Sequence, residues 1–154
     1  MNERAFMIPA DRYELSGLLA EWAWLVPESD TPLFLTVMAD WVFGAPDGSI
    51  WRLSALEGDY VRIAANAAEY NALKGTPQWL NKAFCADWQP IAAGNNLLPN
   101  DMECLGWRRH PYLGGELKAG NLQVFSMLTY QSLMGQLHRQ LQPRSGAESE
   151  KSSG

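Results

Sequence analysis

The side chains that could carry out acid–base chemistry are few and far apart along the chain. Asp101 and Glu103 flank Met102, which places both carboxylates on one face if this segment is a strand. His138 lies beside Arg139 on the polar side of a helix-like run. Together the two carboxylates and the imidazole could catalyse a hydrolysis. Solvated charges at a sheet edge explain the carboxylates more simply, and no nucleophile stands at a defined spacing from His138.

Metal and phosphate chemistry lack the spacing that they require. Cys85, Cys104, His110 and His138 are possible zinc ligands, but no CxxC or HxxxH pair brings two of them close along the chain. The sequence contains no GxSxG, GxxxxGK[ST], HExxH or GxGxxG motif. We therefore expect no catalytic residue, no metal and no cofactor, and we expect both cysteines to be reduced thiols.

Length and charge restrict the class of protein further. The chain has 154 residues, of which 47% are hydrophobic, which fits one domain. Residues 1–59 hold ten acidic and three basic side chains, whereas residues 60–154 hold seven and nine. An acidic surface repels phosphate backbones and attracts basic proteins, so a protein partner is favoured over direct nucleic-acid binding. No secretory signal or membrane-length apolar run is evident, which predicts a cytoplasmic protein without a membrane partner.

The elements that position these residues follow from apolar spacing. A helical stripe predicts a first helix that is capped by Asp11 and Glu14 and ended by Pro27. Glu21 and Trp24 fall on the opposite, solvent-facing side of that helix, where a tryptophan is a candidate interface residue. Packing of Trp24 on a neighbouring loop is the alternative. The stripe comprises Leu15, Leu18, Leu19, Trp22 and Val26.

The middle of the chain predicts an antiparallel meander followed by helices. Residues 33–39 are almost continuously apolar, which fits a buried strand without excluding a helix. The Asp47-Gly48 turn lies between two aromatic and β-branched runs, and a second turn at 57–59 leads into another strand. Helices are then expected at 66–75, with Asn66 as the N-cap and Gly75 as a left-handed C-cap, at 76–84, and at 88–93.

The closing segment predicts two strands and a terminal helix. Strands are expected at 102–109 and 122–126. A helix from about residue 129 to 142 should bury Leu133 and Leu137 and close the core. The expected fold is α+β: residues 1–142 form a single domain whose mixed or antiparallel sheet contains the meander and is backed by helices. Residues 143–154 are too polar to bury a core and are expected to be a disordered tail.

The order of several short motifs resembles a known family. Residues 112–116 read Tyr-Leu-Gly-Gly-Glu, residues 120–124 read Gly-Asn-Leu-Gln-Val, and residues 135–140 read Gly-Gln-Leu-His-Arg-Gln. With the hairpin at 41–53, these motifs resemble the C-terminal domain of immunity proteins against type VI secreted DNase toxins, which often follows a GAD-like domain. In the broad sense this family is SMI1/KNR4-like. The resemblance covers residues 41–142, and from the chain length we expect no extra domain.

The resemblance implies a non-catalytic immunity protein that neutralises a cognate type VI effector toxin, a nuclease by expectation, encoded by the adjacent gene. A regulatory protein-binding module of the SMI1/KNR4-like kind is the alternative, and a hydrolase using Asp101, Glu103 and His138 is a third. The identity of the toxin and the oligomeric state stay open. Acidic residues of the first 59 positions should face the basic partner. The contact residues that we predict are Glu21, Trp24, Asp47, Glu57 and Asp59.

Overall fold

A computed structural model describes residues 4–142 of the chain; the expected tail at 143–154 lies outside these residues. The domain is α+β, as predicted from the sequence. Five strands form one antiparallel sheet in the order β1-β2-β3-β4-β5, and two more form a separate antiparallel pair. The strands are β1 (Met7–Pro9), β2 (Thr31–Thr36), β3 (Trp41–Gly44), β4 (Ile50–Leu53), β5 (Tyr60–Ala64), β6 (Glu103–Trp107) and β7 (Leu122–Ser126).

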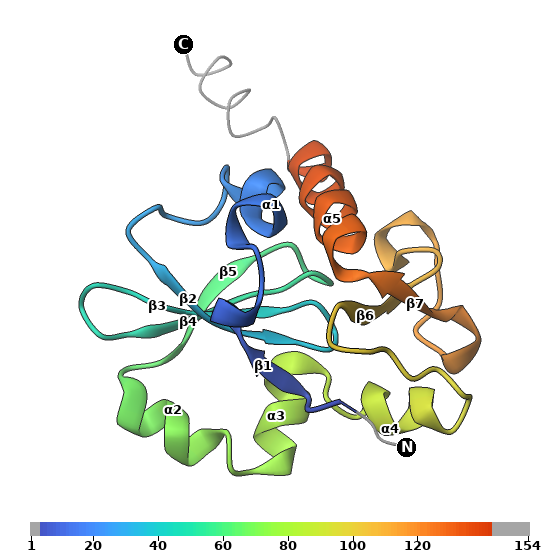
Figure 1. Ribbon diagram of the computed structural model, residues 1–154, viewed down its shortest axis with the longest axis horizontal. Coiled ribbons are helices and arrows are strands. Elements are labelled where there is room, and N and C mark those ends of the chain that lie inside the picture. The colour runs from blue at the N-terminus through green and yellow to red at the C-terminus, as the bar shows by residue number, and fades with distance from the viewer. Residues whose placement is uncertain (1–3, 143–154) are drawn as a thin grey trace.

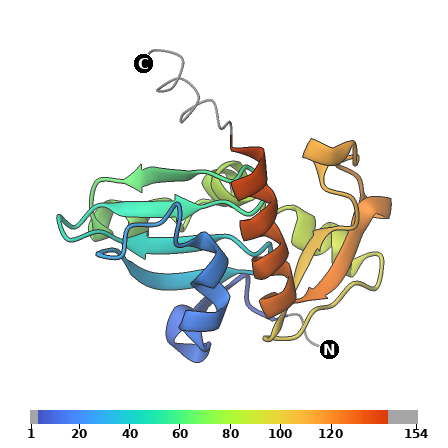
Figure 2. The ribbon, with the colours of Figure 1, turned by 90° about the horizontal axis from the view of Figure 1, so that it is seen from above.

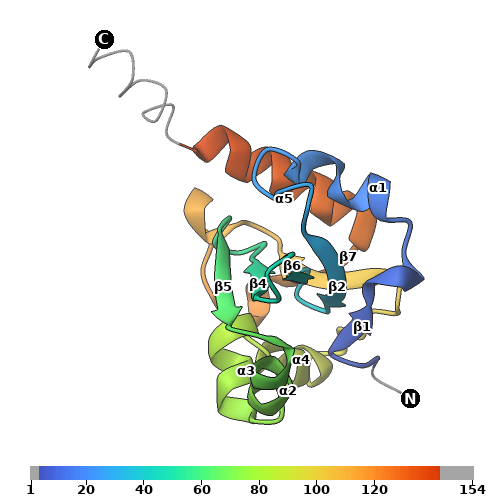
Figure 3. The ribbon, with the colours of Figure 1, turned by 90° about the vertical axis from the view of Figure 1, so that its left-hand side faces the viewer.

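The domain has three layers, which are seen edge-on in Figure 3. The N-terminal and C-terminal helices pack on one face of the five-stranded sheet, and three central helices pack on the other (Figure 1). The helices are α1 (Leu15–Leu19), α2 (Ala67–Leu73), α3 (Pro77–Phe84), α4 (Trp88–Ala93) and α5 (Met127–Leu141). Trp41 and Phe43 of β3 pack on the side of α1 and α5, whereas Val42 packs on the side of α2 and α3. Because successive side chains of a strand alternate between faces, one strand serves both cores.

The predicted meander is confirmed. β3 pairs with β4 in the register Phe43 to Trp51, and the turn between them is closed by a bond from the Gly48 amide to the Ala45 carbonyl. Gly48 has a φ of 91°, a conformation in which glycine costs least. Residues 31–36 form a strand, but the predicted strand at 33–39 ends at Thr36. There the Thr36 hydroxyl accepts bonds from the amides of Met38 and Asp40 and turns the chain back.

β6 and β7 form their own sheet instead of joining the first, and every strand pair in residues 4–142 is antiparallel. Figure 2 shows α5 lying across the space between the two sheets. The Leu105 amide donates a 2.7 Å bond to the Val37 carbonyl, which lies just after β2. This bond ties the small sheet to the turn that follows β2.

The predicted first helix is wrong in its capping and its continuity. Glu14, not Asp11, is the N-cap of α1, and its carboxylate accepts a 2.9 Å bond from the Gly17 amide. The helix ends at Leu19 and is followed by a 3₁₀ turn at Ala20–Trp22. The interruption lets the backbone at Glu21 lie directly against α5 at Gly135, where any Cβ would collide with it.

The three central helices are confirmed, with one change at a cap. The Asn66 side chain accepts a 2.9 Å bond from the Glu69 amide at the start of α2, as predicted. Gly75 does not adopt the predicted left-handed conformation; α2 ends at Leu73, and its C-cap residue, Lys74, is right-handed. The left-handed C-cap is instead Cys85, with a φ of 56°, at the end of α3.

α5 closes the core as predicted, but with a different face. Leu133 is 48% exposed, so its predicted burial is wrong, while Leu137 is partly buried against the core. Gln131 is fully buried, and its side-chain oxygen accepts bonds from the indole N–H groups of Trp22 at 2.8 Å and Trp41 at 3.0 Å. The helix therefore docks by hydrogen bonding as well as by apolar contact. Its buried residues are Met127, Tyr130, Gln131, Met134, Gly135 and His138.

Candidate functional site

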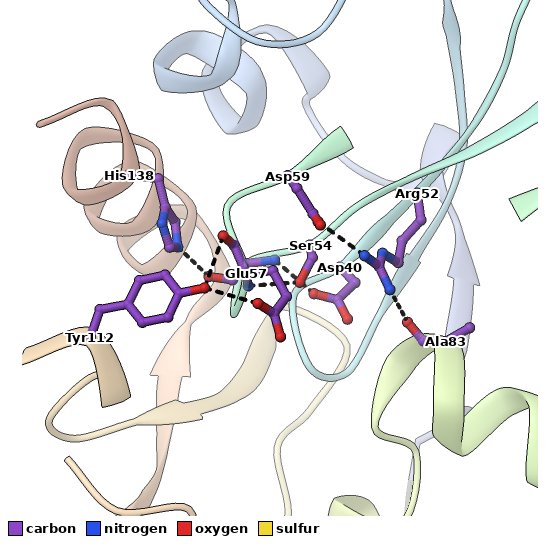
Figure 4. Close-up of polar contacts among 9 residues, drawn as sticks. Asp40, Arg52, Ser54, Glu57, Asp59, Ala83, Tyr112 and His138 are labelled. Carbon is purple, nitrogen blue, oxygen red and sulfur yellow. Dashed lines mark hydrogen bonds and ion pairs between the residues drawn. The ribbon is translucent and has the colours of Figure 1, made fainter. Parts of the chain in front are cut away.

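Residues 54–59 form the loop between β4 and β5 and carry Glu57 and Asp59, two of the predicted contact residues (Figure 4). The loop is closed on itself by hydrogen bonds. The Ser54 hydroxyl accepts from the Glu57 amide at 2.9 Å, the Ser54 carbonyl accepts from the Gly58 amide at 2.8 Å, and the Ser54 amide donates to the Asp59 carbonyl at 3.0 Å. The two carboxylates are therefore presented from a fixed backbone. We refer to residues 54–59 as the acidic loop.

Tyr112, from a distant part of the chain, binds the carboxylate of Glu57. Its hydroxyl donates a 2.8 Å bond to Glu57 Oε1, although the two residues are 55 positions apart. Partial desolvation and then the bond to Glu57 raise the pKa of Tyr112 to about 12, so the hydroxyl keeps its proton at neutral pH. The Tyr112 ring is still 50% exposed and lies beside Leu113, which is equally exposed. An exposed apolar surface therefore borders the carboxylate.

His138 of α5 contacts the acidic loop at Ala55 and Gly58. Only 2% of its surface is exposed, which contradicts its predicted place on the polar side of α5. Its Nε2 lies 2.7 Å from the Ala55 carbonyl oxygen, so Nε2 carries the proton and donates it to that bond. The ring also packs against Gly58, whose φ is 71°. The loop therefore requires both a glycine and an imidazole at this contact.

His110 completes the support. Its Nδ1 accepts a 3.0 Å bond from the Tyr112 amide, and its ring lies 5.2 Å from that of His138 in an edge-to-face arrangement. Burial lowers the pKa of both histidines below the ordinary value of 6.5, and the neighbouring His138 lowers that of His110 further. Both rings are therefore neutral at physiological pH. Their contribution to stability is present above pH 6.5 and is lost as the pH falls below it.

Asp59 connects the acidic loop to the helices on the other face of the sheet. Arg52 of β4 donates from one nitrogen to Asp59 at 3.0 Å and from another to the Ala83 carbonyl of α3 at 2.9 Å (Figure 4). Asp59 is 44% exposed, so this ion pair contributes little free energy by itself. Its effect is geometric, because it fixes the direction of the carboxylate.

A cavity of about 60 Å³ lies behind the acidic loop, between β4, α3 and β6. Asp40 lines it, is only 4% exposed, and accepts a 2.8 Å bond from the Ala55 amide. Burial raises the pKa of Asp40 to about 7, because a charged carboxylate loses its hydration there. Below neutral pH, Asp40 is therefore protonated in the folded protein.

Asp40 predicts a pH dependence of stability. Its folded pKa lies above its ordinary value of 3.8, so its contribution is complete below about pH 4 and is lost as the pH rises towards 7. Since one pKa unit corresponds to about 1.4 kcal/mol, ionisation costs roughly 4 kcal/mol above neutral pH. Asp40→Asn should keep the bond to Ala55 and remove this cost. Urea unfolding at pH 5 and pH 8 should show the variant gaining relative to wild type as the pH rises.

The comparison with wild type serves as the control, because the histidine contributions are common to both proteins and cancel in the difference. A stability difference between wild type and Asp40→Asn that is the same at pH 5 and pH 8 would contradict the assignment of a raised pKa to Asp40.

The other predicted contact residues lie elsewhere. Asp47 sits in the β3–β4 turn, at the opposite end of β4 from the acidic loop. Trp24 is half-buried rather than solvent-facing: it stacks on Trp22 with ring centroids 6.2 Å apart. Glu21 is also partly buried, with its backbone against α5. Of the five predicted residues, Glu57 and Asp59 share the acidic loop, whereas Asp47 lies at the other end of β4.

The hydrolase alternative has no assembled site. Glu103 pairs with Ser126, which caps the start of α5, whereas His138 lies 12 positions further along that helix. At 1.5 Å per residue, about 18 Å separates them along the axis. Glu103 accepts a bond from the Asn100 amide, and the Asp101 carbonyl accepts one from Tyr13.

Sequence reasoning missed Tyr112 and the burial of both histidines. Tyr112 carries no local signal, because its partner Glu57 comes from another part of the chain. One signal in the sequence was Gly58 inside an acidic turn. A glycine there indicates either a positive φ or a neighbouring group too close for a Cβ, and Gly58 has both.

Within residues 4–142, no group of three or more histidine, cysteine or acidic side chains is arranged to hold a metal ion. Cys85 and Cys104 are free thiols. No helix in the described part of the chain has both the length and the apolar character needed to cross a bilayer. Comparison with protein-family models and with curated proteins found no match for this chain.

Proposed function

We propose that this protein is a non-catalytic immunity protein of the cytoplasm that binds and neutralises a type VI secreted effector toxin, a nuclease encoded by the adjacent gene. The family resemblance suggests this role, and one observation carries it. Glu57 is an exposed carboxylate that accepts a bond from the distant Tyr112 hydroxyl, and the loop that carries it is held at the Ala55 carbonyl by His138. A solvated surface acid needs no such support, whereas a recognition group does.

The physical basis of the proposed inhibition is charge mimicry. A nuclease must attract phosphates, so its substrate groove carries a positive potential. Carboxylates fixed at Glu57 and Asp59 can occupy the positions of phosphates without paying the entropy of ordering a flexible loop. The exposed rings and aliphatic groups beside them supply apolar contact area. These exposed residues are Tyr112, which bonds to Glu57, and the adjoining Leu113.

Reversing the charge at Glu57 should slow association with the toxin. We expect Glu57→Lys to reduce the association rate constant by about tenfold at low salt and to reduce its dependence on ionic strength. Stopped-flow mixing with the product of the adjacent gene over a salt series measures both quantities.

Asp11→Lys is the matched control, because Asp11 is also exposed and the substitution changes the net charge equally. If both variants associate at the same rate, the field of the whole molecule and not the acidic loop directs the encounter. If wild type does not bind the toxin, the immunity proposal fails.

Tyr112→Phe removes only the hydroxyl that bonds to Glu57. This variant should accelerate dissociation of the toxin complex, because the Glu57 carboxylate is then held less firmly.

A further inference from the structure

A second surface feature, separate from the acidic loop, has the form of a binding groove. It has a volume of about 600 Å³ and lies between α1, the chain that follows it and the start of β2. This volume is within the range of ligand pockets. Its apolar walls come from Leu15, Leu19, Trp22, Val26, Pro32 and Phe43.

The groove is apolar inside and negative at its rim. Glu28 and Asp30 line one side, and among the described residues that form it none is basic. Asp47 in the adjacent β3–β4 turn adds a further exposed carboxylate near the same end of the sheet, because Thr31 at the start of β2 pairs with Gly44 at the end of β3. A ligand that carries both an apolar group and a positive charge therefore matches this surface.

The wall of the groove is fixed by contacts of its own. The Tyr60 hydroxyl donates a 2.6 Å bond to Asp30 Oδ2, and the Tyr60 ring stacks on Trp51 at 5.2 Å and meets Phe43 edge-to-face at 5.5 Å. Trp22, at the base, is held by Gln131. A preorganised apolar site with a held carboxylate favours binding, because little order is lost when a ligand enters.

We infer that this groove receives a segment of a basic protein partner in which a large apolar side chain is flanked by lysine or arginine. The apolar side chain contacts the partly exposed Leu15, Leu19 and Val26, and the cation lies at Glu28 and Asp30. The inference rests on the proposed function only in assigning this segment to the toxin. It gives the complex a second contact, which anchors the toxin after the acidic loop has attracted it.

Short peptides test the groove without any toxin. We would titrate the ¹⁵N-labelled protein with capped peptides containing Lys-Leu-Phe-Lys, Glu-Leu-Phe-Glu or Lys-Ser-Ser-Lys and follow the amide shifts. The first peptide should bind and shift amides of residues 15–32 and 43, and the other two should bind at least ~10-fold more weakly. Absence of binding by Lys-Leu-Phe-Lys, equal affinity for all three peptides, or shifts centred on residues 54–59 would overturn the inference.

Two variants locate the site. Ala23→Trp adds a ring to an exposed residue that lines the groove and should abolish binding of Lys-Leu-Phe-Lys, whereas Ala72→Trp on exposed α2 should leave it unchanged. Glu28→Gln combined with Asp30→Asn should weaken binding by about tenfold, and the charge-matched control, Asp11→Asn with Asp87→Asn, should not. Equal effects of the groove variants and their controls would overturn the assignment.

The same variants separate this inference from the proposed function. If wild type binds the toxin, Ala23→Trp should accelerate dissociation of that complex relative to Ala72→Trp. If wild type does not bind the toxin, the immunity proposal fails, while the peptide titration still decides whether the groove takes a basic apolar segment.

Discussion

Replacing Gln131 by leucine should lower the free energy of unfolding by about 3–5 kcal/mol, although leucine is more apolar and similar in size. The Gln131 oxygen accepts from the indoles of Trp22 and Trp41, and its nitrogen donates to the Ala39 carbonyl at 2.9 Å. All four residues are fully buried, so no water can replace the lost bonds. Each buried polar group left without a partner costs about 1–3 kcal/mol.

Urea unfolding followed by tryptophan fluorescence measures the effect of Gln131→Leu, since two indoles report on the altered site. Gln136→Leu is the matched control: Gln136 lies on the same helix, is exposed, and bonds only to Ser132. That substitution should change stability by less than about 0.5 kcal/mol. Equal effects at the two positions would refute the role given to the buried glutamine.

Gly58→Ala should cost about 3 kcal/mol and disturb the acidic loop. Gly58 has a φ of 71°, which costs a residue with a Cβ roughly 1 kcal/mol. The added Cβ would also overlap the His138 imidazole, and such overpacking costs a further 1–3 kcal/mol. Relief of the overlap would move His138 away from the Ala55 carbonyl and release the loop that carries Glu57. Association with the proposed toxin partner should therefore slow together with the loss of stability.

Gly48→Ala separates these two costs. Gly48 has a φ of 91°, but a Cβ there would meet nothing within 4 Å. Its substitution should cost only the backbone term, about 1 kcal/mol, and leave the acidic loop unchanged. If chemical unfolding gives the same loss for both glycines, the contact between Gly58 and His138 contributes no stability.

Local signals in the sequence were sufficient where the structure depends on neighbours along the chain. The Asp47-Gly48 turn predicted its hairpin, because this turn requires a residue that tolerates positive φ between two strand-like runs. Asn66 likewise predicted the start of α2, since a side-chain cap bonds to an amide three residues later.

The candidate site could not be predicted in the same way, because its contacts are distant in sequence. Apolar periodicity selected Leu133 for burial, yet that residue is exposed, and α5 turns Gln131 and His138 inwards. Their burial is possible only because Trp22, Trp41 and Ala55 supply hydrogen-bond partners 83–109 positions away. A pattern of single residues contains no information about such pairs. Glu57 was predicted as a contact residue from charge alone, whereas its support by Tyr112 emerged only from the fold.

The position of Gln131 near the end of the described chain constrains when the protein can fold during synthesis. Trp22 and Trp41 emerge from the ribosome long before the amide group that pairs with them. Until residue 131 has emerged, the sheet face that α5 covers stays open, and pairing over so many positions is slow. A nascent chain therefore exposes the aromatic surface of this core until α5 has emerged, and the described domain cannot complete its packing before then.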